Sequence, residues 1–580
     1  MTDIAAPTVV GKDRPDAKAA QLAKRYRAER RFRAYGIGAI ILTAIFLALV
    51  LADILVKGIP AFSEHNLDLQ ITADQAELDP EKTGDPSVLL AGDYNGLIRD
   101  ALRAEFPAVE SRADRRLLNG LLSSGAADDF RRMVAADPSL VGQTVDVPVL
   151  LSDDADQYLK GYQTDRAVES GEGNLTVSVD GTTYKARSSG DDFAEAYAEV
   201  RAFLGKRLDA LDSEVERLES SMAGLSADAA TTLKGQIDAL KTTAETLRTK
   251  LLDTTGSMEL DTNLPSILVT VNGGTIKAAT LDGAGIEGEA IIPPSTVGGA
   301  SASEWSLVTL ETPEADRRVG DKEVTWLEQL RAKGELQKAF ATRFFTSGDS
   351  REPELAGLRG ALFGSLLTLA VTLVLCLPIG VAAAIYLEEF APKNRVTELI
   401  EININNLAAV PSIVFGLLGL AMFLNFFGLP RSAPLVGGLV LALLVLPTII
   451  IASRAALRAV PPSIKEAALG VGASHQQAIF HHVLPLAMPG IMTGTIIGMA
   501  HALGETAPLL MIGMVAFIVD IPGGITDAAT VLPVQIYLWS DLPEVAFQAK
   551  TAATIIVLLL VLFVMNFAAI LLRRRFERRW

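Results

Sequence analysis

Two titratable side chains, His501 and Glu505, stand inside a long run of apolar residues. An ionisable group at the depth of a membrane costs roughly 3 kcal/mol unless it is paired or faces water. A spacing of four places both side chains on one helical face, and Gly504 and Pro508 loosen the helix there, which is tolerable where backbone lines a cavity. We expect Glu505, with His501 and Thr506, to line a solute path, where the carboxylate pairs with a cation or gates an anion. The alternative is a hydrogen bond between packed helices.

A polar loop over residues 453–487 joins two apolar runs and has no reason to lie in lipid. A proline pair ends the preceding helix, a short helix follows, two glycines break it, and a second helix is predicted from Ser474 to Pro485. Small alanines let another protein approach closely, and a glutamate offers that protein a charge. The residues expected to transmit force to a docked partner are Glu466, Ala467, Ala468, Gly472, Leu484 and Pro485. The alternative is an ordinary cytoplasmic loop.

The chain carries no G-x-x-x-x-G-K-[ST] segment, so it lacks the usual backbone cradle and lysine for nucleotide phosphates. If the chain works in an ATP-driven machine, a separate subunit binds ATP and Mg²⁺. We find no clustered His, Cys or nucleophile in the polar insertion, and we expect no catalytic residue, bound cofactor or metal in this chain. The single Cys376 is interpreted as an inert, small apolar side chain.

Polarity is strongly segregated along the 580 residues, of which 49% are hydrophobic and 21% charged. Charge-free runs near the roughly 20 residues that a spanning helix needs alternate with polar stretches, and residues 57–357 are polar and mostly acidic. This pattern predicts an α-helical polytopic membrane protein with one large water-soluble insertion. The six predicted spans are 36–56, 360–387, 404–428, 434–453, 488–514 and 553–572.

Basic residues crowd the N-terminal arm, 1–35, and the C-terminal tail, 573–580. By the positive-inside rule both ends are cytoplasmic, and an even number of spans agrees. The same parity places the loop at 453–487 inside and residues 57–357 outside, and leaves a five-helix membrane domain over 358–572. Arg454 and Arg458, in the loop, are interpreted as positive-inside anchors rather than ligands. The first span is predicted to be an uncleaved anchor, because the basic arm is longer than that of most signal peptides; a cleaved signal is the alternative.

The insertion is predicted to be an α+β domain. Alternating runs meet at Asp180-Gly181 and again at Asn272-Gly273, which are hairpin signals. Between them, about 196–252, two segments repeat apolar residues at 4-3 spacing, which favours an antiparallel coiled-coil hairpin of helices. The hairpin either packs within the domain or forms a rod that touches a partner subunit, and the scattered acidic residues are interpreted as a solvated face.

Three segments of the membrane part, Pro489–Gly494, Gly504–Leu510 and Leu532–Tyr537, together resemble the PstA-type permeases of phosphate importers. The spacing from Glu466 to Pro485 resembles the coupling loop of binding-protein-dependent transport permeases, a loop that amino-acid and sulfate permeases share. The resemblance covers 355–580, with the first span as the family's first helix. His482 stands where the family usually has Ile, His501 stands where it often has Arg, and the long insertion departs from the compact members.

The resemblance implies an architecture of the ABC type I importers, in a bacterial cytoplasmic (inner) membrane. It implies that the chain is a permease subunit rather than an enzyme, and that it moves inorganic phosphate by alternating access. The implied partners are a PstC-type permease, a PstB-type ATPase dimer and a periplasmic phosphate-binding protein, within membrane lipid and without nucleic acid. The alternatives are a permease for another oxyanion or small solute, and a membrane sensor whose outer domain detects a signal.

Overall fold

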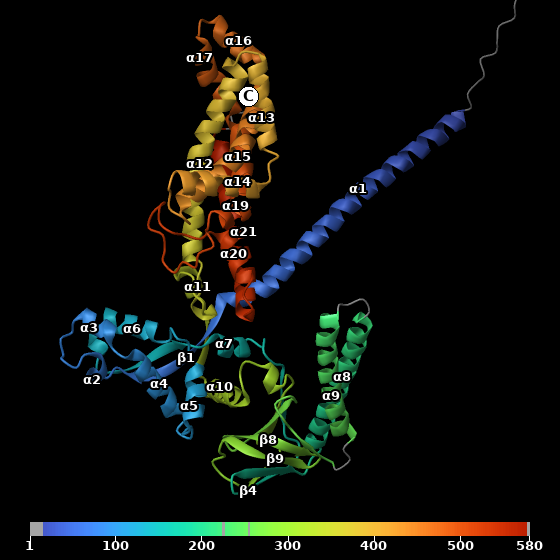
Figure 1. Ribbon diagram of the computed structural model, residues 1–580, viewed down its shortest axis with the longest axis vertical. Helices are drawn as coiled ribbons and strands as arrows, with labels where there is room; N and C mark the ends of the chain where they lie inside the picture. Colours follow the sequence, from blue (N-terminus) through green and yellow to red (C-terminus); the bar gives the residue numbers. More distant parts are fainter. Residues whose placement is uncertain (1–14, 223–226, 253–255, 577–580) are drawn as a thin grey trace, which may run out of the picture. The chain divides into compact units, whose positions relative to one another are not determined.

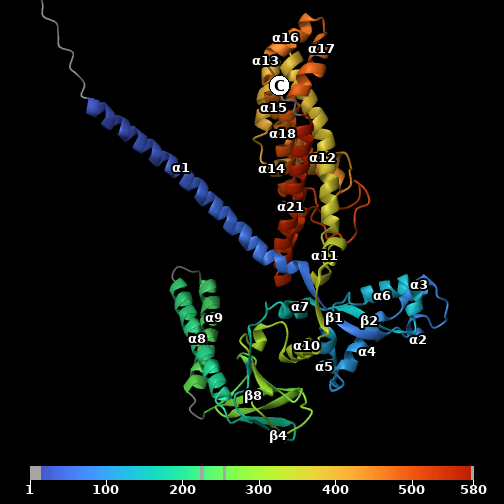
Figure 2. The ribbon, with the colours of Figure 1, turned by 180° about the vertical axis from the view of Figure 1, so that it is seen from behind.

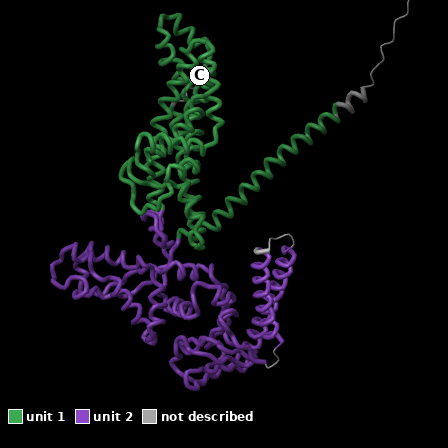
Figure 3. Tube along the Cα trace, viewed as in Figure 1, with its two compact units in different colours: residues 1–62, 358–580 green, residues 63–357 purple. Residues whose placement is uncertain are grey.

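The computed structural model describes residues 15–222, 227–252 and 256–576. The chain divides into two compact units, which Figure 3 shows in different colours. Unit 1 combines Met1–Phe62 with Leu358–Trp580, and unit 2 is Ser63–Gly357. The polar insertion is therefore a compact unit of its own.

Unit 1 is helical (Figures 1 and 2). Among the described residues, five helical segments are long and apolar enough to cross a membrane: Lys24–Phe62, Arg359–Phe390, Pro434–Arg458, His475–Gly504 and Val545–Arg575. They correspond to α1 (Pro15–Gly58) with a short 3-10 turn, α12 (Arg359–Ile385) with a π turn over Tyr386–Phe390, α15 (Pro434–Arg458), α17 (His475–Ala478) joined to α18 (Leu484–Gly504), and α21 (Val545–Phe576). Gly58, at the end of α1, packs so closely on α21 that an added Cβ would lie 2.7 Å from Ile556.

The run predicted as one span over 404–428 is divided in the structure. Helix α13 (Arg395–Leu407) and helix α14 (Ser412–Gly419), which a π turn extends to Phe426, meet at an angle of 101°. Pro411 stands at the junction, where it has no N–H to continue the hydrogen-bond ladder of α13. The bent pair adds a sixth candidate if it is one span.

The run predicted as one span over 488–514 is also interrupted. Helix α18 ends at Gly504, Glu505 is extended with φ −78° and ψ 120°, and the short helix α19 (Ala507–Met511) follows. Pro508 cannot donate a backbone hydrogen bond, which favours the break. Helix α19 packs on α14, where a Cβ at Gly416 would lie 2.7 Å from Pro508 Cα.

One part of unit 2 is a three-stranded sheet in the order β12-β1-β2, antiparallel throughout. Its strands are β1 (Ser63–Thr72), β2 (Thr144–Leu150) and β12 (Leu336–Phe340), and the associated helices are α2 (Gln75–Leu78), α3 (Pro86–Ala91), α4 (Tyr94–Glu105), α5 (Arg112–Gly120), α6 (Ala127–Ala136) and α7 (Asp153–Leu159). Leu67, Leu69 and Ile71 alternate along β1 and all face the core. The period of two thus fixes which face of the strand the helices cover.

The other part of unit 2 is a nine-stranded antiparallel sheet in the order β10-β4-β5-β9-β8-β7-β11-β3, with β6 beside β8. Its strands are β3 (Arg166–Ser170), β4 (Leu175–Asp180), β5 (Thr183–Ser188), β6 (Ser257–Glu259), β7 (Ser266–Val271), β8 (Gly274–Asp282), β9 (Gly285–Ile292), β10 (Gly299–Ala300) and β11 (Trp305–Leu310). Both predicted hairpins are confirmed as β4–β5 and β7–β8, with positive φ at Gly181, Asn272 and Gly273. Trp305 and Phe193 stack 5.7 Å apart in the core of this part.

The 4-3 apolar pattern folds as two helices, α8 (Asp192–Ser221) and α9 (Ala227–Leu252), which lie side by side in Figures 1 and 2. Asp212 pairs with Arg248 at 2.7 Å and Glu219 pairs with Lys241 at 2.6 Å, so the two helices run antiparallel. Val215, Ile237 and Ala244 are buried along the seam. Leu225, the last apolar residue of the first 4-3 segment, lies outside the described residues.

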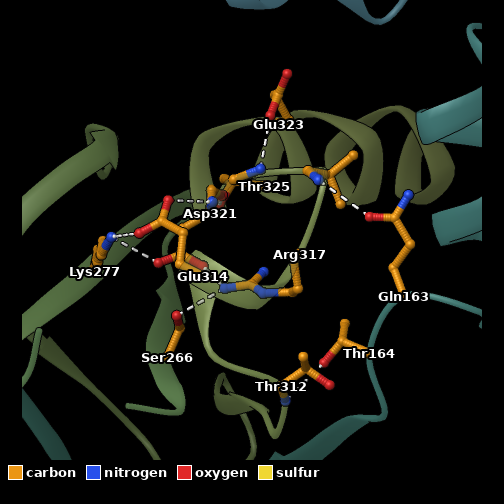
Figure 4. A network of polar contacts seen from close by, with 12 residues as sticks. Gln163, Thr164, Ser266, Lys277, Thr312, Glu314, Arg317, Asp321, Glu323 and Thr325 are labelled. Carbon is orange, nitrogen blue, oxygen red and sulfur yellow. Dashed lines mark hydrogen bonds and ion pairs between the residues drawn. The ribbon is translucent and has the colours of Figure 1, made fainter. Parts of the chain in front are cut away.

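Helix α10 (Asp321–Lys333) is tied to the nine-stranded sheet by the buried ion network of Figure 4. Asp321 is fully buried; it accepts from Arg317 at 2.5 Å and pairs with Lys277 at 2.7 Å. Arg317 also donates to Ser266 at 2.9 Å. Burial alone would raise the pKa of Asp321, but hydrogen bonds and charge from Lys277 and Arg317 outweigh it and hold the pKa below its usual range.

Candidate functional site

The polar loop after α15 forms two short helices separated by a glycine turn. Helix α16 (Pro462–Gly470) begins at the proline pair, and Gly472 adopts φ +92°, a conformation that L side chains rarely take. Ser474 then caps α17, accepting from Gln477 N at 3.2 Å while the Gln477 side chain accepts from Ser474 N. The second helix does not end at Pro485, which lies in the first turn of α18, so the loop continues directly into the next membrane helix.

This loop presents a mixed apolar and polar surface at one end of unit 1, where Figures 1 and 2 show α16 and α17. Glu466 and Ala467 are exposed while Ala468 is buried. Val471 is 86% exposed and Phe480 is 45% exposed, so apolar side chains lie at the surface beside Glu466. Leu484 and Pro485 are half-buried in the first turn of α18.

Beneath the loop, the acidic end of α12 pairs with the loop itself. Glu389 lies in an ion pair with Lys465 of α16. His475 Nε2 lies 3.0 Å from the backbone oxygen of Glu389, and its ring meets Phe390 edge-on with centroids 5.0 Å apart. Both short helices of the loop are therefore bonded to one turn of α12.

The neighbouring Glu388 ties the same turn to the end of α15. Its carboxylate oxygens lie 2.7 Å from Arg458 Nε and 3.4 Å from Arg454 Nε. Arg454 reaches Glu401 of α13 as well, at 2.7 Å. These two arginines are thus ion-pair partners of Glu388 and Glu401, and the cluster joins α12, α13 and α15.

The predicted pair in the fifth apolar run makes contact. His501 Nε2 lies 3.1 Å from Glu505 Oε1, with the His501 side chain 59% exposed and that of Glu505 19% exposed. The sequence placed Glu505 within a membrane helix, but in the structure it lies at the break after α18. Thr506 is the residue that precedes α19. At this break the exposed Gly504 therefore lies next to the half-buried carboxylate of Glu505.

Comparison with known proteins gives a family. A model described as the binding-protein-dependent transport system inner membrane component matches residues 376–580, and a domain of unknown function (DUF3333) matches residues 19–169. The phosphate transport system permease protein PstA 1 of Mycobacterium tuberculosis is 33% identical over 223 residues, which cover 38% of this chain and 72% of that protein. The chain belongs to the PstA-related, binding-protein-dependent transport permeases.

Other matches include a second curated permease and a solved structure. The probable ABC transporter permease protein YqgI of Bacillus subtilis is 36% identical over 169 residues, which are 29% of this chain and 57% of YqgI. The inward-facing MetNI methionine ABC transporter has a TM-score of 0.29 and 17% identity, covering 38% of this chain and 95% of that chain. The family assignment rests on the sequence matches, and it makes the chain a transport permease rather than an enzyme.

The structure of the permease adds a polar residue that sequence reasoning did not single out. Gln535, in α20 (Leu532–Ser540), is 1% exposed, yet neither its amide oxygen nor its amide nitrogen has a hydrogen-bond partner among the described residues. An unpaired amide in an apolar environment costs about 1–3 kcal/mol. In the sequence, Gln535 is marked only by its place inside the PstA-like segment Leu532–Tyr537. The fold shows that its amide is buried and unpaired.

Proposed function

We propose that this chain is the transmembrane permease subunit of an ATP-driven importer for inorganic phosphate. The observation that carries the proposal is the 33% identity to PstA 1 over 72% of that protein's length. The loop surface supports it, because exposed Val471 and Glu466 offer a separate ATPase both apolar and charged contacts. The chain itself has no phosphate-binding loop for ATP, so ATP and Mg²⁺ would be bound by that subunit.

In the proposed mechanism the ATPase dimer closes on ATP and moves the loop, and the loop moves the helices. Glu466, Ala467, Ala468 and Gly472 would make or shape the docking contact. Lys465 and His475 would pass the movement to Glu389 at the end of α12, and Glu388 would pass it to α15. The helices would then re-pack between outward-open and inward-open arrangements.

We place Glu505, His501 and Thr506 on or near the phosphate path. An unpaired carboxylate would repel phosphate. His501 lies 3.1 Å from Glu505, and a protonated imidazole there would neutralise the charge of the carboxylate. Donors from a PstC-type subunit would complete the path, since phosphate leaves water only for cations or backbone N–H groups.

The proposed topology has six spans, with the bent pair α13 and α14 as one of them, and both termini cytoplasmic in a bacterial inner membrane. Arg573, near the end of α21, donates to Thr493 of α18 at 3.2 Å, which supports placing the basic tail on the side of the coupling loop. Unit 2 would then be extracytoplasmic. The antiparallel pair α8 and α9 would be a coiled-coil hairpin, available to a periplasmic phosphate-binding protein or to the partner permease.

Uptake of labelled phosphate by cells that depend on this permease tests the proposal. ATP-dependent phosphate uptake should be unaffected by excess sulfate or molybdate and should be abolished without the ATPase. Competition by sulfate or molybdate at equal concentration would instead assign the permease to another oxyanion.

A further inference from the structure

Helices α4 and α5 of unit 2 enclose an open hollow of about 670 Å³ whose lining is mostly arginine. Five of its seven lining residues are arginines, and the others are Asn119 and Gly120. We call it the arginine hollow, and its arginines are Arg99, Arg103, Arg112, Arg115 and Arg116. The chain as a whole carries a net charge of −16, so this concentration of positive charge is local.

Nearby carboxylates do not neutralise the arginine hollow. Asp100 pairs with Arg103 at 2.9 Å, whereas Glu105 and Asp114 pair with lysines of α10. Within the described parts of the chain, no ion pair joins the other four arginines to a carboxylate, and Arg115 donates only to a backbone carbonyl, at 3.2 Å. Four of the five guanidinium groups therefore line one hollow without an ion pair to a carboxylate of the described chain.

Two local features make the cluster of arginines less favourable in free energy when no ligand is bound. Arg112 is the first residue of α5, where the helix dipole favours anions and disfavours cations. Arg103 Nε and Asn119 Oδ1 are buried without a hydrogen-bond partner among the described residues. The like charges and the unpaired Nε–H of Arg103 would both be relieved by an anion that accepts several hydrogen bonds, whereas Asn119 Oδ1 is itself an acceptor and would need a donor.

We propose that the arginine hollow binds a phosphate-bearing anion. The planar guanidinium group donates two parallel hydrogen bonds that match the oxygens of a phosphate group, and each such charge-assisted bond is stronger than a neutral one. The site lies in unit 2, so it is distinct from Glu505 and from the coupling loop of unit 1. It does not depend on the proposed transport function, because its ligand class follows from the arginines alone.

Two sources share this chemistry, free inorganic phosphate and the headgroup of an anionic lipid. Arginine labelling with phenylglyoxal, read peptide by peptide by mass spectrometry on the full chain, locates binding without measuring transport. One arm adds inorganic phosphate to the chain in neutral detergent at constant ionic strength, and the other adds phosphatidylglycerol to the micelles without phosphate. Arg217, exposed on α8 and paired with Glu214, is the internal reference.

We expect labelling of Arg99, Arg112 and Arg116 to fall several-fold in one arm, with that of Arg217 unchanged. The arm that protects them identifies the source. In the double variant R112Q/R116Q, the concentration that protects Arg99 should rise by about tenfold or more, since two charge-assisted contacts are lost. R217Q should leave that concentration unchanged, and glutamine preserves helix propensity at the exposed positions.

No protection in either arm would overturn the proposal, as would equal protection of Arg217. Failure of phosphate uptake would leave the labelling result unaffected, so the two proposals fail separately.

Discussion

The glycine turn in the coupling loop permits a test that changes backbone preference alone. Gly472 has φ +92°, and a Cβ added there would meet no atom within 4 Å. Gly472→Ala therefore introduces no steric clash, but it places an L side chain in a left-handed conformation that costs about 1–2 kcal/mol. If docking requires this conformation, the competent population falls by about 5–30-fold, and the apparent affinity for the ATPase falls by the same factor.

Gly470→Ala is the matched control. Gly470 also has open space around its Cβ, but it belongs to α16 and has no positive φ. Alanine in a helix is neutral or slightly stabilising. The affinity of the purified ATPase for each detergent-solubilised variant, together with phosphate taken up per ATP hydrolysed in proteoliposomes, measures the effect. Equal affinities for the two variants would refute the role of this turn in docking.

Four further changes probe the loop, the path and the outer unit. Glu389→Gln should reduce uptake while the ATPase still binds, because the bond from loop to α12 loses its charge; unchanged uptake would contradict that relay. Glu505→Gln should lower phosphate uptake without loss of assembly, and wild-type uptake would exclude the carboxylate from the path. Asp321→Asn should destabilise unit 2 by about 3–5 kcal/mol in urea unfolding followed by proteolysis, since it leaves the buried Arg317 without a carboxylate partner while Lys277 keeps its ion pair with Glu314; a loss below about 1 kcal/mol would mean that the Arg317 pair is solvated. Asp153→Asn should stabilise unit 2 at pH 8, because burial raises the pKa of Asp153 to about 7. A raised folded-state pKa destabilises the fold as pH rises from about 4 to 7, so the gain should grow over that range to a few kcal/mol and vanish near pH 4; a gain independent of pH would exclude this cause.

Local signals in the sequence predicted much of the outer unit. Asn272-Gly273 marks a two-residue turn because both positions need positive φ, and the structure places both there. The 4-3 spacing from Leu204 to Val215 predicted helices because it creates one apolar stripe, and these two residues are buried in α8. Where one residue type satisfies a local backbone or burial requirement, the sequence alone is informative.

Features set by tertiary packing were less accessible. Apolar composition cannot reveal that residues 404–428 bend by 101°, since a broken and a straight span have the same hydropathy. Gly504 and Pro508 predicted a loosened helix around Glu505, whereas the structure ends α18 at Gly504 and packs α19 against Gly416. The coupling loop was predicted from its spacing, whereas its bonds to Glu388 and Glu389 join residues more than sixty positions apart.

The arginine hollow illustrates the same limit. Its arginines are near one another in the sequence, but acidic residues are interspersed with them, and a sequence-based analysis predicts a solvated face. Only the structure shows that Asp114 and Glu105 are occupied by lysines of α10, some two hundred residues away. Charge balance at a surface is therefore a property of the fold rather than of the segment.

Site-directed cross-linking measures most directly whether the coupling loop docks a separate ATPase. Cys376 is the only cysteine, and it is buried, so Cys376→Ala gives a cysteine-free background. A cysteine at Val471, which is 86% exposed, should cross-link to the ATPase subunit in membranes, and the yield should change when ATP is added. A cysteine at Phe426, 77% exposed on the π turn after α14, is the control and should give no such product. Equal cross-linking from both positions, or none from position 471, would contradict the account.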